Sequence, residues 1–183
     1  MTTRVLSVDI GIINFSYCIV DFTEDDFEVI HIEKMAIGTM KQAACTLATS
    51  LIDLLRASQP INDKPIHYVF IEAQMSRAIK NTILGYTVYS YFYTESCFSR
   101  SGVKISFVPP KMKFHAIEKY FPGVAQDIVC RSKDLKKLSI SIARNIFTTL
   151  EVTKGLEAFE KYKPKLDDIS DVFLQSFSIF LEK

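Results

Sequence analysis

Short apolar runs, separated by turns or by longer segments, constrain the fold of this chain more than any other feature. Three of them fall within the first 35 residues with only short turns between them, which is typical of a meander of strands. Two later runs follow segments that are long enough to form helices. We predict strands over residues 4–10, 14–22, 27–35, 66–72 and 103–108.

Most of the chain between and after these runs has helical spacing. Leu47, Leu51 and Leu55 lie on one stripe, and Pro60 ends that helix. We predict helices over residues 40–58, 77–98, 111–121, 134–150 and 165–182, an irregular segment over 122–133 and a polar connection over 151–164. This order predicts an α/β fold of one domain, residues 1–183, in which a five-stranded mixed sheet is flanked by α-helices.

Composition bounds the class of protein. With 48% hydrophobic residues, the chain can bury a sizeable core without disulfides. No uninterrupted apolar stretch reaches the length of a membrane span, about 18 residues, and a strand begins by Arg4, which leaves no room for a signal or transit peptide. The cysteines are widely spaced and form no CxxC pair, which disfavours a zinc site: Cys18, Cys45, Cys97 and Cys130. We therefore expect a soluble, intracellular protein with reduced thiols and no membrane partner.

Four carboxylates stand where burial makes an isolated charge costly. Asp9 follows one apolar run and Glu72 follows another. Asp168 and Asp171 open the last predicted helix and, being three residues apart, project together from it. Each acid also has an ordinary explanation, as a turn residue, a helix cap or a complement to the helix dipole. The coincidence of all four favours a site for a divalent cation, which relieves the cost of burial.

Oxygen ligands of this kind suit Mg²⁺, for which Mn²⁺ can substitute. Two such ions about 4 Å apart can generate hydroxide on one side of a phosphodiester and stabilise the leaving alkoxide on the other. The first and fourth predicted strands can be neighbours through a crossover connection, which would place Asp9 beside Glu72. The last helix must then bring the other two acids to them. The four acids therefore predict metal-dependent phosphodiester cleavage.

The net charge of +1 conceals a strong asymmetry along the chain. Residues 1–60 hold 4 basic and 8 acidic side chains, whereas residues 73–144 hold 12 basic and 4 acidic ones, a local net charge of +8. A basic segment of this kind predicts a face that binds nucleic-acid phosphates without base specificity. The alternative is a solvated surface whose counter-charges fold alongside it.

Three motifs resemble, in this order, those of Holliday junction resolvases of the RuvC type, and most closely the poxviral and fungal mitochondrial branches. They are SVDIGIINFSYC at residues 7–18, FIEAQ at 70–74 and KLDDISD at 165–171. The resemblance implies a ribonuclease H-like fold and a homodimer. It also implies Mg²⁺-dependent, paired symmetric incisions in four-way DNA junctions, which leave 5′-phosphate and 3′-hydroxyl ends.

The same resemblance assigns roles residue by residue. Asp9, Glu72, Asp168 and Asp171 match the catalytic, metal-binding acids, since the last motif of the family is DxxD. Asp167 is the alternative to Asp168, because a helix also brings residues four apart together.

The family also has a catalytic lysine between the second and last motifs, which stabilises charge on the scissile phosphate. Lys137, preceded by Lys136, resembles the basic pair of the poxviral branch, and Lys113 is the second candidate. Each of them could instead be a lysine of the helix surface. The residues that we expect to contact the phosphates of branched DNA are Arg77, Lys80, Lys111, Lys113, Lys133 and Lys136.

The predicted helix over residues 77–98 carries apolar side chains in almost every direction, so it must be covered on more than one side. One side can pack on the sheet, and a two-fold partner is a natural cover for the other. Burial by the rest of the chain is the alternative.

Two other functions remain open alongside junction resolution. One is a less selective ribonuclease H-like nuclease that acts on flaps, forks or hybrids, and the other is a junction-binding protein without catalysis. A poxvirus-like source would imply resolution of replicated genome concatemers in the cytoplasm of the infected cell.

Overall fold

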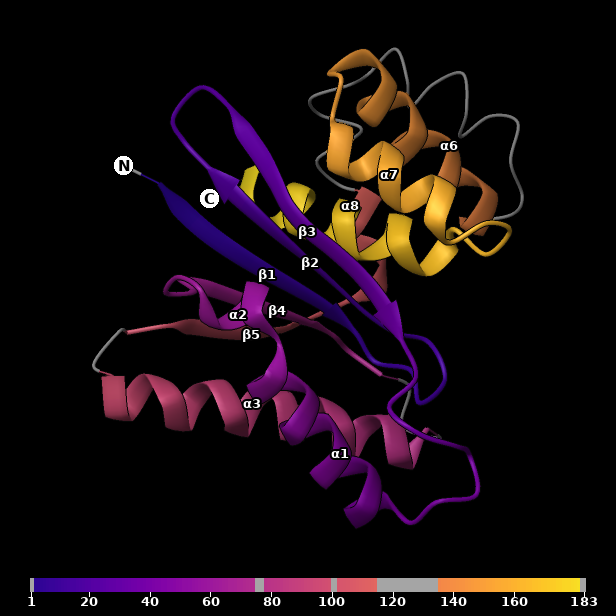
Figure 1. Cartoon of the computed structure of the whole chain (residues 1–183). Helices are drawn as coiled ribbons and strands as arrows, with labels where there is room; N and C mark the ends of the chain where they lie inside the picture. The colour runs from indigo at the N-terminus through magenta and orange to yellow at the C-terminus, as the bar shows by residue number, and fades with distance from the viewer. Residues whose placement is uncertain (1, 75–77, 100–101, 115–134, 182–183) are drawn as a thin grey trace.

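A five-stranded sheet forms the centre of the computed structural model, which describes residues 2–74, 78–99, 102–114 and 135–181 (Figure 1). The strand order is β3-β2-β1-β4-β5. The strands are β1 (Thr3–Asp9), β2 (Phe15–Phe22), β3 (Phe27–Met35), β4 (Tyr68–Glu72) and β5 (Lys104–Val108). β1, β2 and β3 pair antiparallel, whereas β1, β4 and β5 pair parallel, so the sheet is mixed as predicted.

Helices cover both faces of this sheet (Figure 1). On one face lie α1 (Ala44–Ala57) and α3 (Ile79–Ser99), and on the other α6 (Leu135–Thr149), α7 (Thr153–Lys161) and α8 (Asp167–Leu181). Two short elements complete the described chain, α2 (Gln59–Asn62) and the 3-10 helix η1 (Pro110–Phe114). The predicted α/β sheet with flanking helices is therefore confirmed. No helix among these has both the length and the apolar character that crossing a membrane would require, as far as the described residues go.

Alternate residues of the central strand enter two separate cores. On β1, Val5 packs with α6, α7 and α8, whereas Leu6 and Val8 pack with α1 and α3. All three side chains are fully buried. Because both faces of β1 are covered, its sequence is a continuous apolar run rather than an alternation of apolar and polar residues.

Helix α8 is fixed to the sheet by apolar packing and by two hydrogen bonds. Val172 and Phe173 are fully buried. The Ser7 hydroxyl on β1 donates to the Val172 carbonyl, and Gln175 Nε2 donates to the Phe70 carbonyl on β4 at 3.0 Å. These contacts hold the first turns of α8 over β1 and β4, and so they decide where its acidic N-terminus lies.

The prediction of a polar connection over residues 151–164 is wrong, because this segment contains α7. The helix buries Gly155, Ala158 and Phe159 along one stripe. Two of these residues are small, so the stripe has little apolar character in the sequence even though it packs closely in the fold.

The other helices differ less from their predicted bounds. α1 begins at Ala44 rather than at residue 40, and Pro60 lies in the first turn of α2, after α1 has ended. η1 occupies the start of the helix predicted over 111–121 and has 3-10 rather than α-helical geometry. The rest of that predicted helix, and the irregular segment predicted over 122–133, lie outside the described residues.

Replacement of Gly155 by Ala should destabilise the protein by about 1–3 kcal/mol through overpacking. A Cβ at this position would lie 2.4 Å from Cδ1 of the buried Phe147 ring on α6. This clash outweighs the preference of a helix interior for Ala over Gly, about 1 kcal/mol. The matched control is Gly85→Ala on α3, where the nearest atom is Phe107 Cε1 at 3.2 Å. Urea denaturation measures the free energy of unfolding of both variants. A Gly155→Ala variant as stable as wild type would contradict the packing of α7 on α6.

Candidate metal site

Two strand ends and one helix start bring the four predicted acids to the same edge of the sheet. β1 and β4 run parallel and in register up to the residues before Asp9 and Glu72, so these two carboxylates end neighbouring strands. Asp9 also pairs with Ser16 on β2, whose hydroxyl donates to the backbone carbonyl of Asp168 at 3.4 Å. Asp171 follows one turn later on α8. The structure therefore brings the acids together, while their role as ligands stays a prediction.

Burial and the neighbouring carboxylates raise the pKa values of Asp9 and Glu72. Burial is the main cause that raises the pKa of Asp9 to about 8. Repulsion from the other three acids adds to this rise, and Lys113 partly offsets it. The pKa of Glu72 is also raised, chiefly by burial; attraction to Lys113 opposes the rise, and repulsion from Asp171 and Asp168 adds to it. The four acids thus share one electrostatic field that favours a bound cation.

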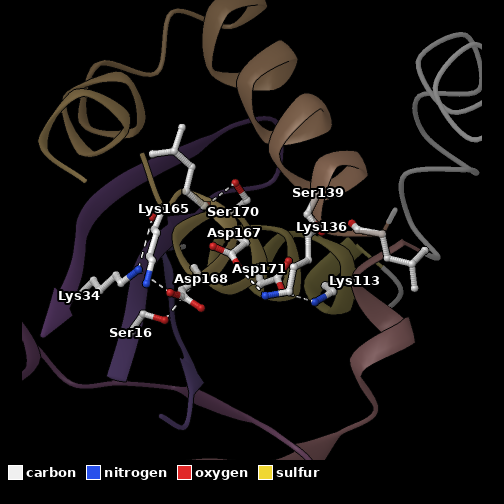
Figure 2. A network of polar contacts seen from close by, with 12 residues as sticks. Ser16, Lys34, Lys113, Lys136, Ser139, Lys165, Asp167, Asp168, Ser170 and Asp171 are labelled. Atoms are coloured by element: carbon white, nitrogen blue, oxygen red, sulfur yellow. Dashed lines mark hydrogen bonds and ion pairs between the residues drawn. The ribbon is translucent and has the colours of Figure 1, made fainter. Parts of the chain in front are cut away.

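Two lysines from opposite sides of the sheet neutralise the helix acids of this set (Figure 2). Lys34 on β3 forms an ion pair with Asp168, and Lys113 in η1 forms one with Asp171. Both lysine side chains are only 11% exposed, so these are not ordinary surface pairs. Each lysine offsets part of the cost of holding several carboxylates together.

Asp167, the alternative to Asp168, has a different environment. Its carboxylate accepts a hydrogen bond from Lys136 of α6 at 2.6 Å, and the Lys136 side chain is 74% exposed (Figure 2). Burial alone would raise the pKa of Asp167, but the hydrogen bond and the charge of Lys136 lower it overall. Asp168, by contrast, is one of the acids whose charge raises the pKa values of Asp9 and Glu72. This difference favours Asp168 as the member of the metal site.

The three candidate catalytic lysines lie in different surroundings. Lys113 is buried and pairs with one of the four acids. Lys136 pairs with Asp167, and Lys137 is exposed on α6. The burial of Lys113 beside Asp171 makes it the candidate that the structure places within the acid cluster.

The donor atoms suit a hard divalent cation, because all of them are carboxylate oxygens. Asp171 Oδ1 is buried and has no hydrogen-bond partner among the described residues, which leaves it available to a ligand. In the same part of the chain no three ligating side chains are already gathered into a metal cluster. Instead, Lys34 and Lys113 each hold one oxygen of an acid, Asp168 Oδ2 and Asp171 Oδ2, so a cation that takes either of these oxygens must displace an ammonium group.

The residues predicted to contact DNA are distributed over several elements. Lys111 is exposed in η1, and Lys136 is exposed at the start of α6. Lys80 donates to two backbone carbonyls in the segment before α1, each at 2.7 Å, so it also joins α3 to that segment. Arg77 and Lys133 lie outside the described residues. Contact of these side chains with phosphates stays a prediction.

Helix α3 is covered on one side only within the described residues. Leu84 and Val88 are fully buried, whereas Ile79, Tyr86 and Phe98 are 68%, 59% and 83% exposed. The described part of the chain therefore leaves the outer apolar side of this helix exposed. The predicted two-fold partner remains the proposed cover.

Lys34 is the site residue that the sequence analysis missed. The strand register contained a signal for it, because Asp9 pairs with Ser16 and Ser16 pairs with Lys34 across three adjacent strands. Residues paired in this way point to the same face of a sheet. Lys34 is also one of only 4 basic residues in the acidic first 60. Counting register through the meander would have aligned this lysine with Asp9.

Comparison of the sequence with known families gives a match over most of the chain. The model of a family described as Poxvirus A22 protein matches residues 3–183. A comparison with individual curated proteins gives no match.

Solved structures that resemble this chain share its architecture. The fowlpox virus resolvase, solved with its substrate Holliday junction DNA, is 24% identical, covers 98% of this chain and 99% of its own, and has a TM-score of 0.63. The yeast mitochondrial Holliday junction resolvase is 18% identical, covers 94% of this chain and 75% of its own, and has a TM-score of 0.59. Thermus thermophilus RuvC in complex with a Holliday junction substrate is 13% identical, covers 97% of this chain and 92% of its own, and has a TM-score of 0.56. These likenesses confirm the predicted ribonuclease H-like fold.

Metal-free protein should lose stability as the pH rises from the ordinary pKa of Asp9, 3.8, to its raised value of about 8. Between these values the folded state keeps a proton that the unfolded state has released. The free energy of unfolding therefore falls with pH, by at most about 1.4 kcal/mol per pH unit from this group. Asp9→Asn removes the ionisation and should flatten the fall. Urea denaturation in EDTA between pH 3.8 and about 8 measures the free energy of unfolding of wild type and Asp9→Asn. If this free energy falls equally steeply with pH in both proteins, the raised pKa of Asp9 is contradicted.

Proposed function

The chain belongs to the poxvirus A22 protein family, and we propose that it is a structure-selective endonuclease that resolves four-way DNA junctions. It does so by paired, symmetric hydrolysis of phosphodiester bonds, which leaves 5′-phosphate ends. One observation carries this proposal: four carboxylates gather where β1 and β4 end and α8 begins, with a buried lysine beside them. The similar solved proteins named above are Holliday junction resolvases, which supports the choice of substrate.

We propose Mg²⁺ as the cofactor, with Mn²⁺ as a substitute. Asp9, Glu72, Asp168 and Asp171 would hold it, because their oxygens are the hard donors that these ions prefer. When bound, divalent ions activate water for attack on the phosphodiester and stabilise the leaving oxygen. The fold contributes the rigid placement of the four acids, since two of them end buried strands and two lie on a helix anchored in the core.

We assign the phosphate-stabilising role to Lys113 rather than to Lys137. Lys113 pairs with Asp171 inside the acid cluster. From there its ammonium group can donate a hydrogen bond to an oxygen of the scissile phosphate when DNA is bound at the metal site. Lys111 and Lys136 are exposed on the neighbouring elements and would contact phosphates of the junction arms. Arg77, Lys80 and Lys133 complete the proposed DNA contacts.

We further propose that the protein acts as a homodimer through the outer side of α3. A groove of about 550 Å³ between α1 and α3 includes Ile52, Ile83 and Tyr86 among its lining residues, next to the exposed apolar side of α3. A two-fold contact here would cover this surface and present two sites to symmetry-related strands, as paired incision requires. Each subunit would be one domain, residues 1–183. In a poxviral setting the substrate would be replicated genome concatemers in the cytoplasm of the infected cell.

Asp9→Asn and Asp168→Asn should each lower the rate of junction cleavage by about 10²–10³-fold, because each removes a charge that the transition state requires. Junction affinity measured in EDTA should be retained. Cleavage of a labelled four-way junction in Mg²⁺, compared with flaps and forks, measures rate and selectivity. Asp167→Asn is the matched control, since this carboxylate pairs with the exposed Lys136. Undiminished cleavage in both site variants would refute the site.

Lys113→Met should lower the single-turnover cleavage rate by about 10²-fold, while junction affinity changes little, because the lost charge acts on the reacting phosphate. Lys137→Met removes the same charge from the exposed surface of α6 and should change the rate far less. If the two variants behave in the opposite way, Lys137 holds the catalytic role and the assignment of Lys113 is wrong.

A further inference from the structure

Lys34 has no role in the proposed function, although it lies within the candidate site. It is on β3, in register with Ser16 and, through it, with Asp9. Its ammonium group forms an ion pair with Asp168 and lies 3.4 Å from the Lys165 carbonyl, to which it donates (Figure 2). A lysine in this place acts on a proposed metal ligand directly.

The position of Lys34 is fixed by contacts that do not involve its ammonium group. Its backbone N–H donates to the Tyr162 hydroxyl at 3.2 Å, and that hydroxyl donates to the carboxylate of Glu33. Lys161 Nζ donates to the same Glu33 carboxylate at 2.9 Å. These bonds tie β3 to the segment that leads into α8, so Lys34 and Asp168 are held opposite each other by the fold rather than by their own attraction.

The ion pair is largely withdrawn from water. The side chains of Lys34 and Asp168 are 11% and 18% exposed. Charges at such a position interact more strongly than a pair on the open surface. A divalent ion that uses Asp168 as a ligand therefore either competes with Lys34 for Oδ2 or binds beside its ammonium charge.

A charge count gives the consequence of this competition. Carboxylates bind a cation in their ionised form; in that form the four acids carry −4, and Lys34 and Lys113 reduce this to −2. One divalent ion completes the neutralisation. A second ion would leave an excess of positive charge in a partly buried site until an anionic phosphodiester enters. Without Lys34, the site without DNA would be one unit more negative and would attract divalent ions more strongly.

We propose that Lys34 is a positioning residue that restrains divalent-ion binding before DNA is bound, by acting as an intramolecular counter-ion of Asp168. This inference rests on the metal site of the proposed function. The lysine keeps Asp168 neutralised and in place while no cation is present, and a cation that takes Asp168 Oδ2 must displace it. Lys34 thereby sets the affinity of the site for metal in the absence of DNA.

Isothermal titration of Mn²⁺ into the 183-residue protein without DNA tests this directly. Lys34→Met should bind Mn²⁺ about tenfold more tightly than wild type, since one like charge has been removed from the site. Lys34→Gln should do the same, which keeps the test available if the Met variant fails to fold. Lys34→Arg keeps the charge and should restore an affinity close to that of wild type. Thermal unfolding in EDTA checks that each variant is folded.

The matched control is Lys154→Met on α7, which removes a lysine that pairs with Glu157 at 3.6 Å and is 60% exposed. Its affinity for Mn²⁺ should equal that of wild type. Unchanged or weaker binding in both Lys34→Met and Lys34→Gln would overturn the role of Lys34, provided that wild type binds the ion and Asp9→Asn does not. Absence of Mn²⁺ binding by wild type would overturn the metal site itself, and with it this inference.

Discussion

Mutual repulsion among carboxylates at one edge of the sheet is the constraint on which the rest of the site depends. Burial and neighbouring acids raise the pKa of Asp9 to about 8, so the fold holds this group where its charged form is disfavoured. The opposing free energy comes from packing elsewhere. Val172 and Phe173 on α8 are fully buried, and each large apolar side chain so placed contributes about 1.5–3 kcal/mol. The helix that carries two of the acids is thus also a principal part of the core.

Much of the fold could be predicted because its strands are buried on both faces. Continuous apolar runs mark β1 and β4, and the acidic turn before β3 marks the meander. Helix α7 was not predicted because it packs through Gly155 and Ala158. Their small size permits close approach to Phe147 but gives almost no apolar signal in the sequence. Sequence periodicity detects large buried side chains, and it fails where close packing depends on small ones.

The four acids could be predicted to come together from local signals, whereas the ion pairs that neutralise two of them could not. Asp9 and Glu72 each end an apolar run, and Asp168 with Asp171 opens a helix, so each has a local signal. Lys113 was named as a candidate, but its pairing with Asp171 has no local signal, and Lys34 has only the indirect signal of the strand register. Their partners lie 58 and 134 residues away along the chain. Lys137 attracted attention through its neighbour Lys136, yet Lys137 is exposed and Lys136 pairs with Asp167. Neighbours in the sequence do not show which lysine lies beside the acids, because that depends on tertiary contacts.

The sheet order explains how the counter-ions reach the acids. β1 is the central strand and β4 lies between it and the edge strand β5, so Asp9 and Glu72 come from the interior of the sheet. Lys34 comes from the edge strand β3, and Lys113 comes from η1, directly after the opposite edge strand β5. Lysine suits these positions because its ammonium group sits on a long flexible stem, which can withdraw when another cation takes the carboxylate. The fold therefore keeps the acids on strand and helix ends and places the neutralising charges on long lysine side chains. Such a division lets the lysines stabilise the cluster of carboxylates without a bound cation, and it leaves the acids open to the cation that we propose.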